Sequence, residues 1–307
     1  MSISFFDPLS RAWGRMIEAL FKPFDIGKWF AVGFTAFLAE LTEGPHGSMF
    51  NDSEDYNGEC WRDIFEGPRI AWEWLTDNPG WFMLIIFGLV VLIGFIILLT
   101  WLSSRGKFML LDNVVHNKSQ ISKPWKEYAK QADSLFIWRF CFGLLCFFIV
   151  VIMLSVFGNT MYNFYQNDFE SPALVISIVI MALTFIALVL VISFISMALN
   201  DFVVPIMYKH KLSAVQGWNR FFPILGKHLL YFLIYGVIIL VFTIIVVIGV
   251  MIFGFMTCCI GFVLLVIPYI GSVVTLPITY VYRGYSIEFL AQFGSEFNVF
   301  PAKKVKK

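Results

Sequence analysis

Charged residues are scarce in this 307-residue chain: Asp, Glu, Lys and Arg make up 14% of it, whereas hydrophobic residues make up 59%. Soluble domains carry about one-quarter charged residues, so this composition excludes an ordinary soluble protein. The apolar residues gather in runs of roughly 20, the length that crosses a hydrocarbon core of about 30 Å as a helix. The sequence therefore predicts an all-α, polytopic membrane protein.

Cysteine is also scarce, and the five cysteines do not suggest a disulfide framework. Two lie inside one apolar run, two are adjacent in another and one stands in a polar loop: Cys141 and Cys146, Cys258 and Cys259, and Cys60. The four histidines are scattered without a metal-ligand spacing. No Walker A, GxSxG or suitably placed GxGxxG motif is present. We therefore predict no cofactor, no metal site and no catalytic residue.

Five apolar runs are predicted as membrane spans: 81–102, 137–157, 174–198, 229–252 and 258–282. An earlier run, 29–41, is so short that on length alone it could be a re-entrant or interfacial segment. None of the five runs has an ionisable residue in its centre, which disfavours a proton-coupled transporter. The last run contains Pro268, Gly271 and Pro277, which either kink the helix or open a site.

Basic residues are distributed unequally along the chain. If 29–41 spans the membrane and the N-terminus is cytoplasmic, 20 of the 22 Lys and Arg residues fall on the cytoplasmic side, and only Arg62 and Arg69 lie outside. This asymmetry follows the positive-inside rule and favours six spans with both termini cytoplasmic, with five spans as the alternative. The outer loop 42–80 is acidic and the tail 299–307 is basic. The start lacks the features of a cleavable signal peptide, so we expect it to be retained.

Three cytoplasmic segments share one spacing of apolar residues around a tryptophan. Each has a residue four positions before it and three, four and seven positions after it: Leu9, Trp13, Met16, Ile17 and Leu20; Ile121, Trp125, Tyr128, Ala129 and Ala132; Ala214, Trp218, Phe221, Phe222 and Leu225. This spacing describes one face of a helix. We predict three interfacial amphipathic helices whose tryptophans enter the headgroup boundary, while Lys123, Lys126 and Lys130 face water and anionic lipid.

The order of segments indicates an internal repeat. Each amphipathic segment precedes a span, an outer connection, a second span and a cytoplasmic tail, and two tails begin alike, RGKFMLLDNV at Arg105 and RGYSIEFLAQ at Arg283. The sequence predicts three repeat units, 9–118, 119–211 and 212–298, within a single membrane domain covering 1–307. The alternative is that amphipathic linkers place a tryptophan at the interface without any duplication.

Polar residues gather at the predicted cytoplasmic ends of the spans: Arg105, Asp112, Asn200, Asp201, Arg283 and Glu288. Three hairpins around a pseudo-symmetric centre would bring these side chains together as a ligand site or polar cluster on the inner face. The alternative is that they cap the helices and anchor them at the interface.

Four stretches carry a resemblance to known proteins: PFDIGKWFAVGFTAFLAEL, WLSSRGKFMLLDNVV, PWKEYAKQADSLFIWRF and LPITYVYRGYSIEFLAQFG. They resemble a group of uncharacterised bacterial integral membrane proteins, similar to the membrane-embedded region that precedes the catalytic barrel in some glycerophosphodiester phosphodiesterases. The resemblance implies an all-helical domain in the inner membrane of a bacterium and adds no catalytic residue. The barrel with its metal-binding carboxylates is absent, because no soluble stretch is long enough to form it.

The leading hypothesis is a non-enzymatic protein of a bacterial plasma membrane that organises the membrane, interacts with lipid or takes part in an assembly. We expect membrane lipids, including anionic ones, as partners, and no nucleic acid. One alternative is a transporter or permease for a neutral or amphiphilic small molecule. Another is an inner-face enzyme acting on lipid headgroups, which requires Asp112, Asp201 and Glu288 to converge.

Overall fold

The computed structural model describes residues 3–42, 72–166, 172–257 and 260–301. Nearly all of these residues are helical, and no β-strand occurs among them. Most of the predicted outer acidic loop, the adjacent cysteines at 258–259 and most of the basic tail lie outside the described residues. The chain divides into two compact units: the first contains 1–42, 101–139 and 190–307, and the second contains 43–100 and 140–189.

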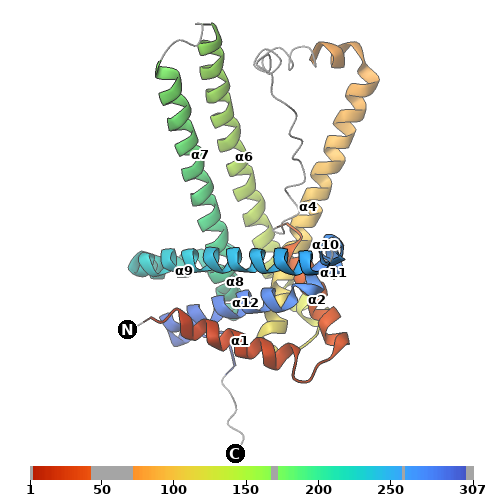
Figure 1. The fold of residues 1–307 in the computed structure, drawn as a ribbon, viewed down its shortest axis with the longest axis vertical. Helices are drawn as coiled ribbons and strands as arrows, with labels where there is room; N and C mark the ends of the chain where they lie inside the picture. The colour runs from red at the N-terminus through yellow and green to blue at the C-terminus, as the bar shows by residue number, and fades with distance from the viewer. Residues whose placement is uncertain (1–2, 43–71, 167–171, 258–259, 302–307) are drawn as a thin grey trace, which may run out of the picture. The chain divides into compact units, whose positions relative to one another are not determined.

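Four helices are long: α4 (Pro79–His116), α6 (Ala129–Gln166), α7 (Pro172–Ala198) and α9 (Ala214–Met256) (Figure 1). Each is long and apolar enough to cross a membrane, α7 together with the π-helix η1 (Leu199–Val203) and α8 (Val204–His210) that continue it. Their most apolar stretches are not buried inside the protein, and side chains such as Phe87 and Leu190 are exposed. Hydrocarbon is the environment in which such faces are stable, so the helices suit a membrane-integral protein.

The second unit contains residues 79–100 of α4, 140–166 of α6 and 172–189 of α7. Residues 72–77 form a short helical segment before α4. Here the ring of Trp72 meets Phe82 edge-on at 6.2 Å, and Trp74 lies 6.5 Å from Trp81. Aromatic rings gathered at the start of an apolar helix are typical of a membrane interface.

The first unit also contains shorter helices: α1 (Phe6–Leu20), α2 (Ile26–Glu40), α5 (Ser122–Glu127), α10 (Ile260–Val266), α11 (Pro268–Val274), α12 (Leu276–Leu290), η2 (Ala291–Phe293) and η3 (Ser295–Phe297). The α1 helix lies along α12 (Figure 1), and α2 packs against α11. This pairing joins the first helix of the chain to one of the last.

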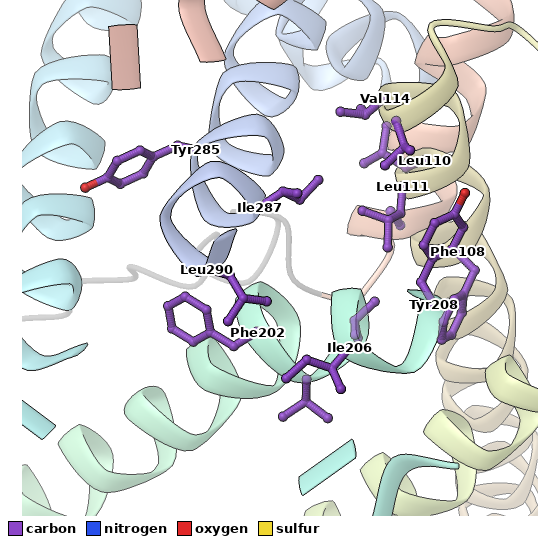
Figure 2. Packing of buried hydrophobic residues seen from close by; sticks show 14 of the residues in the cluster. Phe108, Leu110, Leu111, Val114, Phe202, Ile206, Tyr208, Tyr285, Ile287 and Leu290 are labelled. Atoms are coloured by element: carbon purple, nitrogen blue, oxygen red, sulfur yellow. The ribbon is translucent and has the colours of Figure 1, made fainter. Parts of the chain in front are cut away.

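Three helical segments meet in the core of the first unit. Figure 2 shows side chains of α4 such as Leu111, of η1 such as Phe202 and of α12 such as Ile287 in one apolar cluster. The α4 helix has 38 residues, about 57 Å at 1.5 Å per residue, which exceeds the roughly 30 Å of a hydrocarbon core. Its buried residues run from Ser103 to Val115, so the surplus length forms the centre of the first unit.

Local sequence sets several helix ends. The carboxylate of Asp25 accepts hydrogen bonds from the first turn of α2, and Ser213 with Gln216 forms a capping box at the start of α9. Lys211 ends α8 in the left-handed conformation, with φ of 53°. Within α9 the backbone leaves the helical region at His228, so the predicted interfacial helix and the predicted span are separated there.

Two of the six predicted spans are not confirmed. Residues 29–41 lie in α2, which has 15 residues, about 22 Å, and buries Val32 and Ala36 inside the first unit. Within the predicted span 258–282, residues 260–282 form the short helices α10 and α11 and the first turns of α12. Proline stands at the start of α11 and α12, and Ile267 before Pro268 is extended, the conformation that a following proline favours.

The three predicted amphipathic segments bury part of the predicted face, shifted by about one residue toward its neighbouring side. The residue before each tryptophan is buried, namely Ala12, Pro124 and Gly217, and so is the residue three positions after it, namely Met16, Tyr128 and Phe221. The tryptophans lie at the edge of this face and differ: Trp13 is exposed, Trp125 is half-buried and Trp218 is buried. Residues four positions after them, such as Phe222, are exposed or half-buried. The buried faces contact protein rather than lipid.

Replacing Gly106 with Ala tests the close approach of α4 to α2. A Cβ atom at this position would lie 2.5 Å from the backbone of Leu38 and Ala39, so one helix has to shift. We expect a loss of about 1–3 kcal/mol or more of stability, measured by thermal unfolding in detergent. Gly94→Ala on the same helix is the control, because nothing lies within 4 Å of its added Cβ. Equal melting temperatures for the two variants would contradict this packing.

Candidate functional site

A π-helix interrupts the path from α7 to α8 and carries two polar residues. In η1 the N–H of Val204 bonds to the carbonyl of Leu199, one residue further back than in an α-helix. Asn200 and Asp201 lie in this segment, both half-buried. Such π segments are rare and occur frequently at functional sites.

Two cations from other helices converge on Asn200. The side chain of Lys107 on α4 is fully buried, and its ammonium donates to Oδ1 of Asn200. Arg283 on α12 donates from Nη1 to the backbone carbonyl of Asn200 at 2.7 Å. One asparagine therefore links α4, η1 and α12 through charge-assisted hydrogen bonds, which are stronger than neutral ones.

Asp201 extends the same cluster to α9. The hydroxyl of Tyr235, which is fully buried, donates to Oδ2 of Asp201 at 3.1 Å. The ring of Tyr235 stacks on that of Tyr285, with centroids 5.1 Å apart and planes inclined by 16°. We call Lys107, Asn200, Asp201, Tyr235 and Arg283 the polar core cluster. It joins four helical segments and contains two cations and one carboxylate.

Tyr285 lies beside the polar core cluster with an unused donor. Its side chain is buried, and its hydroxyl has no hydrogen-bond partner among the described residues. In Figure 2 this hydroxyl points away from the apolar cluster around Ile287. Burial raises the pKa of Tyr285 to about 12, so the hydroxyl is protonated and able to donate at neutral pH.

The predicted site residue Arg105 belongs to a different group. Its guanidinium pairs with Asp133 at 2.9 Å and donates to the carbonyl of Trp125 at 3.3 Å. The same guanidinium lies 4.8 Å from the ring centre of Trp101 and 5.1 Å from that of Trp125. Arg105 therefore anchors the second amphipathic segment to α4.

Asp112 and Glu288 each have their own partners. Asp112 accepts from the hydroxyl of Tyr208 at 2.7 Å and lies 3.1 Å from Nδ1 of His116. Glu288 on α12 is buried and pairs with Arg15 of α1 at 2.8 Å and with Arg11 at 3.3 Å. Burying a carboxylate costs free energy. The donors that contact each of these two carboxylates offset that cost.

The structure thus brings together three of the six predicted site residues, Asn200, Asp201 and Arg283. The other three, Arg105, Asp112 and Glu288, tie pairs of helices together elsewhere in the first unit. Sequence reasoning missed Lys107 and Tyr235. Lys107 stands two residues after the predicted site residue Arg105, in RGKF, which is a signal for the site. Its charge also fits the many basic residues predicted at the inner face, so the sequence does not distinguish the two roles.

The predicted lipid-interface residues have different environments. Lys123, Lys126 and Lys130 are all exposed. Trp218 instead stacks on Trp138 with centroids 5.5 Å apart, inside the protein. Among the described residues, no group of three or more His, Cys, Asp or Glu side chains is placed to hold a metal ion.

Replacing Tyr208 with Phe tests the bond to Asp112. The change removes the donor and leaves a buried carboxylate with one partner fewer, so we expect a loss of about 1–3 kcal/mol in thermal or denaturant unfolding. Tyr269→Phe is the matched control, because its hydroxyl donates to the carbonyl of Phe30 at an exposed position. A control variant that loses as much stability as Tyr208→Phe would contradict the importance of this buried bond.

Comparison with known proteins gives one result. No curated protein and no solved structure matches the chain. The model of the family of unknown function DUF7544 matches residues 3–293, which is most of the sequence. The protein therefore belongs to the family of unknown function DUF7544.

Proposed function

We propose that the protein is a non-enzymatic component of a bacterial plasma membrane that interacts with lipid through basic segments at its cytoplasmic face. The four apolar helices support residence in a membrane. The bias of Lys and Arg toward one side, which holds when 29–41 is counted as a span, supports cytoplasmic termini. The bacterial inner membrane comes from the family resemblance alone, and the likeness to the membrane region of glycerophosphodiester phosphodiesterases adds no residue to the proposal.

One observation carries this proposal: the second amphipathic segment, 121–132, is fixed to the core with its lysines facing outward. Pro124, Tyr128 and Ala132 are buried, whereas Lys123, Lys126 and Lys130 are exposed. The rings of Tyr128 and Tyr208 stack with centroids 4.7 Å apart, which holds the segment in this orientation. A row of exposed ammonium groups beside apolar helices favours anionic headgroups over zwitterionic ones.

A threefold repeat is part of the same proposal. The buried faces of the three amphipathic segments have the same register, since the residue before the tryptophan and the residue three positions after it are buried in each segment. The first segment packs on α12 where Gly284 faces Ala12, and the third packs on α8 where Gly217 faces Met207. Small residues at the same register allow close helix packing in both places. Three such segments would offer three places for lipid binding on one domain.

Neutralising the exposed lysines tests the function. Each basic residue near an anionic surface contributes about 1 kcal/mol, so replacing Lys123, Lys126 and Lys130 with Gln lowers the preference for anionic lipid by roughly a hundredfold. The measurement is binding of fluorescent phosphatidylglycerol and phosphatidylcholine to the purified protein in mixed micelles. Replacement of the same lysines with Arg keeps the charge and is the control. The proposal fails if the wild-type protein has no preference, or if the Gln variant keeps it.

A transporter or permease for a neutral or amphiphilic small molecule is the second candidate, and the break between α10 and α12 favours it. Discontinuous helices supply backbone groups to substrate sites in many transporters. Here Ile267 is extended between α10 and α11, and Thr275 separates α11 from α12. The hydroxyl of Tyr269 reaches the carbonyl of Phe30 at 2.9 Å and links this region to α2.

Cysteine labelling distinguishes the transporter from the lipid-interacting protein. Single cysteines placed at successive positions from 260 to 282, in a cysteine-free background, are treated with membrane-impermeant reagent from either side. A transporter predicts that positions around Ile267 and Thr275 become labelled from both sides, because its site is open to each side in turn. Labelling that is confined to one side at every position would count against transport.

A further inference from the structure

The outward side of α2 is apolar from its first residue to its last turn. Exposed or half-buried side chains recur there every three or four positions, which describes one side of a helix: Ile26, Phe30, Phe34 and Phe37. We call these four residues the outer stripe. Lys28, the charged residue within this stretch, lies on another side and donates to the side chain of Asn117 at 2.7 Å. A helix whose outer side meets water carries polar residues there, so the outer stripe suits an apolar environment.

Tyr269 of α11 holds the outer stripe in place. The centre of its ring lies 6.0 Å from that of Phe30, 6.1 Å from that of Phe34 and 6.2 Å from that of Phe37. Its hydroxyl donates to the backbone carbonyl of Phe30 at 2.9 Å. Ile26 and Phe30 nevertheless remain 60% and 46% exposed. The stripe is therefore a defined surface of two helices that the rest of the first unit leaves uncovered.

The small residues of α2 are on its inner side, where they are already used for packing. A Cβ atom on Gly33 would lie 2.5 Å from the side chain of Val273 on α11, and Ala36 is fully buried. Ala39 is buried where Gly106 of α4 approaches α2. Helices associate in membranes mainly through small residues, which let their backbones come close. The large side chains of the outer stripe favour acyl chains over a helix of a second copy.

The same kind of surface continues on neighbouring helices of the first unit. The α10 and α11 helices contain no charged residue, and Val263, Val266 and Ile267 along them are exposed. In turn, α10 packs on α9, which is long and apolar enough to cross a membrane. A protein interface ends in a polar rim, and the described residues of α10 and α11 provide none. This continuity places the outer stripe in the same environment as α9.

We propose that the outer stripe of α2, with Tyr269, faces the acyl chains of the bilayer that surrounds α9. The α2 helix then has two roles, because its small residues pack the core of the first unit and its large ones contact lipid. The contact involves acyl chains rather than headgroups. It therefore goes beyond the lipid interaction proposed for the exposed lysines, and it does not depend on that interaction being correct.

Spin labelling of the whole chain in liposomes of phosphatidylcholine and phosphatidylglycerol tests this contact. A nitroxide is attached to Phe30→Cys in a cysteine-free background, and its relaxation is measured with oxygen, which concentrates in hydrocarbon, and with a nickel chelate, which stays in water. Leu240→Cys on α9 and Glu296→Cys on η3 are the lipid and water controls, both at exposed positions. We expect the ratio of oxygen to nickel accessibility at Phe30 to match that at Leu240 and to exceed that at Glu296 several-fold.

Ile26→Cys replaces Phe30→Cys if the latter does not fold, because Ile26 is the more exposed of the two. The proposal is overturned if the stripe label is as accessible to nickel as the label at Glu296, since the stripe then faces water. It is also overturned if oxygen and nickel are both excluded, which would show that a second copy covers the stripe. The lysines are tested by lipid binding instead, so the two proposals fail separately.

Discussion

Burial of the Lys107 ammonium is the constraint on which the core of the first unit depends. A lysine removed from water is stable only beside acceptors that hold it at close range, because desolvation of a charge costs several kcal/mol. Oδ1 of Asn200 is one such acceptor, and Arg283 binds the backbone of the same residue. The positions of α4, η1 and α12 are therefore coupled at one point. The apolar contacts around Leu111, Phe202 and Ile287 pack the same three segments against one another.

Membrane spans were predictable because a bilayer imposes a length on apolar helices. The runs 81–102, 137–157, 174–198 and 229–252 all lie inside α4, α6, α7 and α9. The run 258–282 does not form one such helix among the described residues, because a proline stands at the start of α11 and of α12. Hydrophobicity alone does not show where a proline interrupts a helix. In the same way, the apolar composition of α2 does not distinguish a helix that crosses lipid from one buried against α11. Both segments depend on contacts with residues far away in the sequence.

The candidate site was only partly predictable for a related physical reason. Polar residues at the ends of spans pointed to Asn200, Asp201 and Arg283, since such residues are costly near hydrocarbon unless they are paired. A lysine near the end of a span usually lies at a membrane surface. Lys107 is buried instead, because α4 continues beyond the length of a span into the core of the first unit. Tryptophan was a good marker of the three basic segments but a poor marker of their buried face. An indole with one polar atom is as stable at the edge of a protein core as at a lipid headgroup, so Trp13 and Trp218 differ in burial.

The pairing of α1 with α12 has a consequence for biosynthesis. Arg15 and Glu288 are 273 positions apart, so α1 leaves the ribosome long before the helix that it packs against. At the usual pace of about 5–20 residues per second, this interval lasts on the order of 14–55 seconds. During that time the apolar face around Ala12 and Met16 cannot pack on α12. The nascent chain therefore has to keep this apolar face out of water, at a membrane surface or on a chaperone, until α12 is synthesised.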